Sequence, residues 1–270
     1  MKISIIGTGN LATHLSAACG RSGVQVLQVW GRNAEKAKAV AALSGAAAIS
    51  GFHDLNQTAD LILLAVADDA IAEMANSLAA LFGKSEAQPV VVHLSGATPM
   101  AVLQAAALKH YGVFWPLQSF RSGKTVDFKK VPICINASDE KALASISRLA
   151  RLLSDEVCTV SEEQRQTLHL AAVFVNNFTN HLLTISKELT DEAGVPFKLL
   201  KPLLRETVNR LDEADPQDMQ TGPAIRGDLK TIERHMHLLA AHPRFRQLYA
   251  LLSESIRNRD EGTGMRDEKG

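Results

Sequence analysis

The chain has 270 residues, 46% of them hydrophobic, and its 29 lysines and arginines balance 29 aspartates and glutamates. This length and composition are typical of a soluble globular protein with one large domain or two modest ones. A net charge of zero gives no overall attraction to nucleic acid or to an anionic membrane, so neither is expected as a partner. The longest apolar runs, Leu61–Ala67 and Leu170–Val175, are too short to span a bilayer.

The first residues and the cysteines favour a cytoplasmic location. Met1 and Lys2 lead directly into a strand pattern and not into the apolar core of a signal peptide. Cys19, Cys134 and Cys158 are widely spaced and form no CxxC pattern. They are predicted to be buried thiols in a reducing compartment, without a disulfide framework or a metal site.

Residues 2–160 alternate short β-rich runs with helical stretches, which is typical of βαβ units around a parallel sheet. One run, Leu61–Val66, is apolar throughout, as expected of a central strand that is covered on both faces. The predicted strands are Lys2–Ile6, Gln25–Trp30, Ala47–Ile49, Leu61–Val66, Val90–His93, Val131–Ile135 and Val157–Val160. The predicted helices between them are Leu11–Arg21, Ala34–Ser44, Ala70–Phe82, Met100–His110 and Lys141–Ser154.

After Ser161 the strand patterns stop and only helical patterns follow. They cover Glu162–Ala193, Phe197–Leu211, Asp228–Ala241 and Arg244–Arg257. The predicted fold is therefore an α/β Rossmann dinucleotide-binding domain, residues 1–160, followed by an all-α domain for substrate binding and dimerisation, residues 161–257. Residues 258–270 are charged and have no apolar face, so they are predicted to be a disordered tail.

The first strand runs into a GxGxxA motif that opens a helix. In a dinucleotide site Gly7 permits a sharp turn, Gly9 lets the backbone approach a pyrophosphate, and Ala12 lets helix and strand pack closely. The pyrophosphate lies on the free N–H groups at the start of that helix. The predicted cofactor-binding residues here are Gly7, Thr8, Gly9, Asn10, Leu11 and Ala12. The alternative is a structural turn that binds nothing.

The end of the second strand favours NADP over NAD. An NAD site usually has an acidic residue there to hold the ribose hydroxyls, but this strand ends in Gly31-Arg32-Asn33. Arg32 offers a planar fork that matches a 2′-phosphate, Asn33 would cap the next helix, and Lys36 lies one turn further on. The alternative is that Arg32 is a solvated surface residue.

Several longer motifs resemble known reductases. The segments ISIIGTGNLATHL, GRNAEKA and ADLILLAVADDAI resemble the NADP-binding domains of the β-hydroxyacid dehydrogenase and pyrroline-5-carboxylate reductase superfamily. The segments VVHLSGATPMAVL, YGVFWPLQSF, HLAAVFVNNFTNHL and TGPAIRGDLKTIERH resemble a group within it, NADP oxidoreductases with a Rossmann-like first domain and a helical second domain. This resemblance implies a two-domain dimeric reductase whose site lies in the cleft between the domains.

The same resemblance places three loops beside the nicotinamide or the substrate. Two of them follow predicted strands, at the edge where ligands bind in open α/β sheets, and the third is the polar–aromatic loop Trp115–Phe120. The candidate cofactor contacts are the backbone of Val66 and Ala67, and Ser95 and Gly96; the candidate substrate contacts are Gln118 and Ser119. His93, inside an apolar strand, is expected to be a satisfied core histidine.

Polar residues form a stripe on the otherwise apolar helix predicted after residue 161. His169, Asn176 and Asn180, followed by Thr184, recur at helical spacing, and buried polar groups need partners. They are predicted to form a catalytic substrate wall. The alternative is that they form hydrogen bonds between packed helices or across a dimer interface. Superfamily relatives have a catalytic lysine on the comparable helix, but no lysine lies between Gln164 and Ser186. His169 is therefore the candidate proton donor.

The segment from Thr221 to Asp228 resembles the loop-to-helix segment that closes the substrate site in reductases of this superfamily. Arg226 could hold a substrate carboxylate in a bidentate pair, and Asp228 is expected to cap the next helix. His235 and His237 point to different faces of a helix, so no metal site is expected.

Together these patterns predict an NADPH-dependent oxidoreductase that acts on a small carbonyl or imine compound. It is expected to be a homodimer through its helical domain. The alternative is a non-catalytic dinucleotide-binding protein whose helical domain is an interaction surface, an alternative favoured by the missing lysine.

Overall fold

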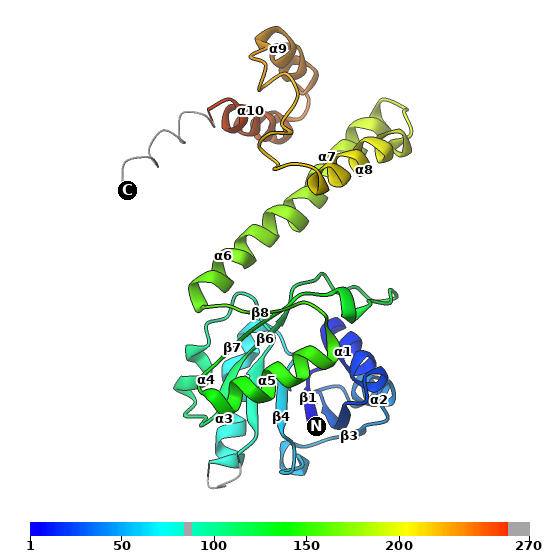
Figure 1. Cartoon of the computed structure of the whole chain (residues 1–270). Helices are drawn as coiled ribbons and strands as arrows, with labels where there is room; N and C mark the ends of the chain where they lie inside the picture. The colour runs from blue at the N-terminus through cyan, green and yellow to red at the C-terminus, as the bar shows by residue number, and fades with distance from the viewer. Residues whose placement is uncertain (84–87, 259–270) are drawn as a thin grey trace, which may run out of the picture. The chain divides into compact units, whose positions relative to one another are not determined.

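The computed structural model describes residues 1–83 and 88–258 of the chain (Figure 1). The chain divides into two compact units, Met1–Asn177 and Phe178–Gly270. The last strand ends at Thr159 and the next helix begins at Glu162. The expected division of 1–160 from 161–257 stays a prediction, and the predicted tail 258–270 lies outside the described residues from 259 onward.

The first unit is built on an eight-stranded sheet in the order β3-β2-β1-β4-β5-β6-β7-β8. The neighbouring strands pair in parallel except for β6 and β7, which are antiparallel. Hence the α/β Rossmann prediction is confirmed. The strands are β1 (Lys2–Ile6), β2 (Gln25–Trp30), β3 (Ala47–Ile49), β4 (Leu61–Leu64), β5 (Val90–His93), β6 (Tyr111–Pro116), β7 (Ile133–Ala137) and β8 (Val157–Thr159).

Strand β6 is the main departure from the sequence prediction. The predicted helix Met100–His110 is only the short α4 (Ala101–Ala105), and residues from Tyr111 onward form a strand that the sequence analysis missed. Between β6 and β7 the chain has only the short η3 (Phe128–Lys130), without the crossover helix that a parallel connection needs. The sheet is therefore parallel except at this pair, where the predicted βαβ pattern does not hold.

Helices cover both faces of the sheet. Ile3 and Ile5 of β1 pack in the cluster that includes α1 (Asn10–Arg21), α2 (Ala34–Ala42) and α5 (Glu140–Leu153). Ile6 packs in a second cluster with α3 (Ile71–Phe82) and α4. Every residue of β4 is buried, as predicted for a central strand, and each buried Leu or Ile side chain contributes roughly 1.5–3 kcal/mol. The short 3₁₀ turns η1 (Phe52–Asp54) and η2 (Asp68–Ala70) connect these elements.

The predicted long helix Glu162–Ala193 is interrupted. It consists of α6 (Glu162–Ala172), a π-helical segment η4 (Val173–Phe178) and α7 (Thr179–Glu192). Because i→i+5 hydrogen bonding adds a residue to the turn, the regular spacing assumed for His169, Asn176 and Asn180 does not hold across η4. The stripe is therefore not that of one continuous α-helix.

The remaining elements of the second unit are helical, which confirms the all-α prediction. They are η5 (Phe197–Leu200), α8 (Lys201–Asn209), η6 (Arg210–Asp212), α9 (Leu229–Leu238) and α10 (Pro243–Arg257). A hydrogen bond of 2.8 Å between His235 Nδ1 and the Tyr249 hydroxyl joins α9 to α10. Within 1–83 and 88–258, no helix has both the length and the apolar character that crossing a membrane requires.

Candidate functional site

The turn after β1 has a backbone geometry that glycine alone allows. Gly7 has a φ of +127°, and a Cβ there would lie 2.0 Å from the carbonyl oxygen of Ala65. The Gly7 N–H donates to the carbonyl of Trp30 at 2.8 Å, which ties the turn to the end of β2. A Cβ at Gly9 would meet nothing within 4 Å, so the backbone there faces open space. Ala12 is fully buried, as close packing of α1 requires.

A cavity of about 590 Å³ lies beside this turn. Helix α1 has Gly9 as its N-cap, no side-chain cap and no acidic residue in its first turn. Its first N–H groups are therefore available to an anion such as a pyrophosphate. Of the predicted cofactor residues, Ala12, Ser95 and Gly96 do not line this cavity. Those that do are Gly7, Thr8, Gly9, Asn10, Leu11, Arg32, Asn33, Lys36, Val66 and Ala67.

One wall of this cavity has a positive charge. Asn33 caps α2 by accepting a hydrogen bond of 2.9 Å from the Lys36 N–H, as predicted. Arg32 and Lys36 are exposed, and neither forms an ion pair with another described residue. Glu73 and Met74 of α3 also line the cavity. The sequence analysis missed these two because no motif marks α3, and only the fold brings this helix to the cavity.

The loop after β5 is held by a residue that the sequence analysis also missed. Arg165 of α6 has 0% of its surface exposed. Its guanidinium donates to the carbonyls of Ser95 (3.0 Å), Gly96 (2.7 Å) and Thr98 (2.8 Å), and to a carboxylate oxygen of Glu162 (2.8 Å). Charge-assisted bonds of this kind are stronger than neutral ones. Arg165 therefore fixes the backbone of this loop against α6.

His93 lies next to this clamp. It is fully buried, and its Nδ1 accepts a hydrogen bond of 3.3 Å from the Ser95 N–H. Its Nε2 has no partner among the described residues, so the expected core histidine is only half satisfied. Burial, together with the positive charge of Arg165, lowers the pKa of His93 to about 3. His93 is therefore neutral near pH 7 and acts as an acceptor for the loop.

Gly96 brings His169 and Trp115 against the same loop. A Cβ at Gly96 would lie 2.6 Å from the Trp115 ring and 2.8 Å from His169 Nδ1, so only glycine fits there. The Trp115 and His169 rings meet edge to face, with centroids 5.8 Å apart. His169 is half-buried, and its position on α6 depends on the same helix that carries Arg165.

A second cavity of about 590 Å³ opens at His169. It brings together four predicted site residues, which are Gln118, Ser119, His169 and Asn176. Asn176 lies in η4, and π-helical segments of this kind are frequent at functional sites. All of these residues belong to the first unit, so this grouping is internal to one compact body.

Two predicted site residues belong to the second unit. Asn180 and Arg226 are both exposed, and neither lines the His169 cavity. Asp228 caps α9 by accepting a hydrogen bond of 3.1 Å from the Thr231 N–H, as expected. A hydrogen bond from the Thr231 side chain, together with this backbone bond and smaller effects of Arg226 and Arg234, lowers the pKa of Asp228.

The cysteines lie apart from both cavities. Cys19 and Cys134 are buried as predicted, and burial raises the pKa of the Cys19 thiol to about 12, so it is unreactive. Cys158 is exposed on the edge strand β8, so the prediction that it is buried was wrong. An edge strand has one side without a neighbour to cover it.

Comparison with known proteins relates both halves of the chain to described families. Residues 1–115 match the Rossmann-like domain, and residues 131–256 match a domain of unknown function, DUF2520. A crystal structure from Bacteroides fragilis, titled "putative NADP oxidoreductase", is 38% identical with a TM-score of 0.85, over 96% of this chain and 98% of that one. The chain therefore belongs to the same family as this Bacteroides fragilis protein. No curated protein matches the chain.

Two more distant structures with the same fold are described as reductases. An imine reductase from Myxococcus stipitatus in complex with NADP⁺ is 17% identical, with a TM-score of 0.64 over 98% of this chain and 96% of that one. A pyrroline-5-carboxylate reductase from Coxiella burnetii is 16% identical, with a TM-score of 0.58 over 96% and 97%. At such identities the likeness concerns the fold alone.

Proposed function

We propose that the protein is an NADP-dependent oxidoreductase that reduces a small carbonyl or imine compound. The observation that carries this proposal is the open space at Gly9, where the uncapped start of α1 faces the cavity lined by Arg32 and Lys36. The 38% identical Bacteroides fragilis protein, described as an NADP oxidoreductase, and the NADP⁺ bound to the imine reductase with this fold support it.

The residues present fit a dinucleotide. The first-turn N–H groups of α1 would hold its pyrophosphate, and Arg32 with Lys36 would hold a 2′-phosphate. When bound, NADPH supplies the hydride. The NADP preference rests on Arg32 and on the absence of an acidic residue at the end of β2.

The residues around His169 would serve the substrate. As the reducible carbon accepts a hydride, its oxygen or nitrogen gains negative charge, and a proton donor there stabilises the transition state. His169 would donate that proton and Asn176 a neutral hydrogen bond, while Gly96 and Trp115 hold the imidazole in place. The aromatic and aliphatic part of the cavity wall would exclude water from the reacting atoms.

We also propose that a second copy of the chain completes the helical unit. Among its described residues only Ala224 and Leu239 are buried, whereas Leu199, Leu203 and Val208 are more than half exposed. Helices without a buried face have little tertiary stabilisation, so the same apolar surface of another copy is the expected cover. Light scattering at micromolar concentration should give twice the chain mass; a monomer would contradict the proposal.

Substitution of Gly9 tests the cofactor site. Gly9 has a φ of −77° and open space around it, so Gly9→Asp and Gly9→Asn should both fold and should cap α1. Only the aspartate places a negative charge where the pyrophosphate would lie. Gly9→Asp should weaken NADPH binding at least about 100-fold by calorimetry, a loss of about 2.7 kcal/mol, and Gly9→Asn much less. Wild-type NADPH affinity in Gly9→Asp would refute the proposed pyrophosphate site.

A substrate panel tests the activity itself. NADPH consumption with carbonyl and imine compounds should be detectable in the wild-type chain and lost in Gly9→Asp. The rival function, a non-catalytic dinucleotide-binding protein, is favoured by the absence of a lysine between Gln164 and Ser186. It predicts that Gly9→Asp abolishes NADPH binding while no compound is turned over by either protein.

A further inference from the structure

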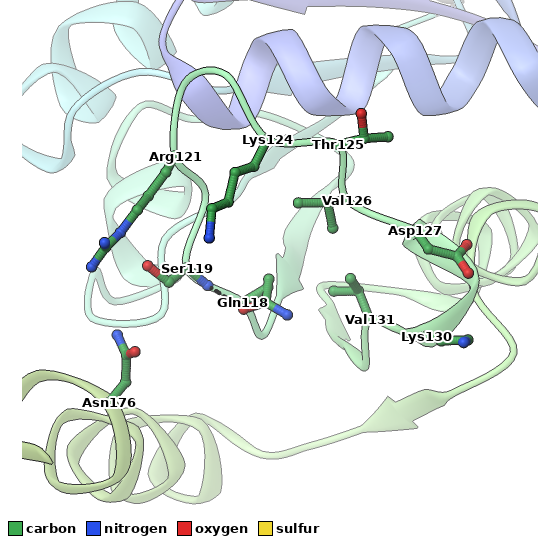
Figure 2. Close-up of a pocket in the computed structure, with 10 residues that line it drawn as sticks. All are labelled: Gln118, Ser119, Arg121, Lys124, Thr125, Val126, Asp127, Lys130, Val131 and Asn176. Carbon is green, nitrogen blue, oxygen red and sulfur yellow. Dashed lines mark hydrogen bonds between the residues drawn. The ribbon is translucent and has the colours of Figure 1, made fainter. Parts of the chain in front are cut away.

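The loop between β6 and β7 lines a third cavity, of about 440 Å³, in the first unit. Three cationic residues of this loop, Arg121, Lys124 and Lys130, line it together with one carboxylate, Asp127. Figure 2 shows the Lys124 side chain extending toward Gln118 and Ser119, while the Asn176 amide points into the same space from η4. None of these residues was predicted from the sequence to form a cationic site.

Hydrogen bonds join the start of this loop to helix α1. The Asn10 side-chain amide donates to the carbonyl of Phe120 at 3.2 Å, and His14 Nε2 donates to the carbonyl of Arg121 at 3.0 Å. The Phe120 ring also stacks on the buried Phe128, with centroids 5.6 Å apart. Arg121 therefore projects from a backbone that is held on two sides.

A glycine turn brings the second cation to the same cavity. Gly123 has a φ of +77°, a conformation that favours glycine, and it lies between Arg121 and Lys124. The chain turns at this glycine, and the side chains of Arg121 and Lys124, on either side of the turn, line the same cavity. Asp127 caps η3 by accepting from the Lys129 N–H at 3.2 Å, so its carboxylate already has a structural role.

Arg121 and Lys124 are not paired with a carboxylate among the described residues. In contrast, Arg165 is paired with Glu162. Like charges that converge on one cavity repel each other, and an anion placed between them removes that repulsion. An arginine fork with an adjacent ammonium group suits a carboxylate or a phosphate.

This cavity adjoins the His169 cavity. Gln118, Ser119 and Asn176 line both of them. A small molecule whose reactive carbon lies near His169 therefore has its other end within reach of Arg121 and Lys124.

We propose that Arg121 and Lys124, with Ser119 and Asn176, bind an acidic group, a carboxylate or a phosphate, of the substrate that is reduced at His169. This inference rests on the proposed function, which it deepens by assigning the substrate to the anionic carbonyl or imine compounds. It places the anion on the β6–β7 loop of the first unit.

The test uses simple anions as probes of the full-length protein. Malonate and inorganic phosphate are titrated calorimetrically into the wild-type chain saturated with NADP⁺, and into the double variant Arg121→Gln/Lys124→Gln. The control is Lys109→Gln/Lys141→Gln, which removes the same charge from exposed positions outside this cavity. At least one probe should bind the wild type and the control equally, and the loop variant at least tenfold more weakly.

Three results would overturn the inference. These are equal weakening in both double variants, binding of the probe only to the chain without NADP⁺, which would assign the cations to the cofactor, and no saturable binding of either probe. Which probe binds more tightly distinguishes a carboxylate from a phosphate. The affinity for NADPH is measured separately, so a chain that fails to bind NADPH contradicts the proposed function without deciding the anion site.

Discussion

Neutralising Glu162 should show how much the free energy of unfolding depends on the ion pair and hydrogen bonds of Arg165. The Arg165 side chain is 0% exposed and that of Glu162 is 28% exposed, with 2.8 Å between the guanidinium and the carboxylate oxygen. In Glu162→Gln the buried guanidinium keeps its bonds to the carbonyls of Ser95, Gly96 and Thr98 but loses its only ion-pair partner among the described residues. The loop that supports His169 should then be held less tightly.

The size of the effect follows from the geometry. Breaking a fully buried ion pair costs about 3–5 kcal/mol. Solvent screens the partly exposed Glu162, and glutamine retains an oxygen that can accept a hydrogen bond, so we expect about 2 kcal/mol here. For a chain of this size that corresponds to a fall in Tm of roughly 4–8 °C.

A double-mutant cycle measured by urea and thermal unfolding checks this reasoning. Glu162→Gln should cost almost nothing when Arg165→Met is already present, because no buried charge is left to compensate. Glu163→Gln is the matched control, since it removes the same charge from the first turn of α6 but lies on an exposed side chain. If Glu162→Gln costs the same in both backgrounds within about 0.5 kcal/mol, the clamp is not an electrostatic one.

Three further outcomes are expected. The pKa of His93 is lowered from 6.5 to about 3, so on acidification the unfolded chain takes up this proton before the folded chain does. The free energy of unfolding should therefore fall as the pH drops from 6.5 toward 3, by up to about 1.4 kcal/mol per pH unit. His93→Gln should flatten that slope in urea unfolding at pH 7.5, 6 and 5; an unchanged slope contradicts the assignment. Arg32→Ala should reduce the thermal stabilisation by NADPH and leave that by NADH unaltered. If NADPH and NADH raise the Tm equally, both in the wild type and in Arg32→Ala, the NADP preference is refuted. His169→Ala should leave NADPH affinity intact and lower turnover at least about 100-fold; normal turnover in a destabilised His169→Ala would mean that the residue only packs.

The features that the sequence determined by itself are local. The turn at Gly7 and the open backbone at Gly9 depend on a strand, a turn and a helix that follow one another in the chain, so spacing was sufficient to place them. The cap at Asn33 is local for the same reason. The apolar run that forms β4 indicated a buried central strand because its burial follows from composition alone.

The tertiary structure decided the features whose partners are distant. In β6, Gly112 and Pro116 resemble turn residues, yet a Cβ at Gly112 would lie 2.3 Å from the carbonyl oxygen of Asn136 on β7, so that glycine is required by a strand pairing. Arg165, three residues after Glu162, looks in the sequence like half of a solvated helical ion pair. Only the fold brings to it backbone carbonyls of the loop after β5, 67 to 70 positions earlier, and it is this long-range contact that makes a surface-like arginine part of the site.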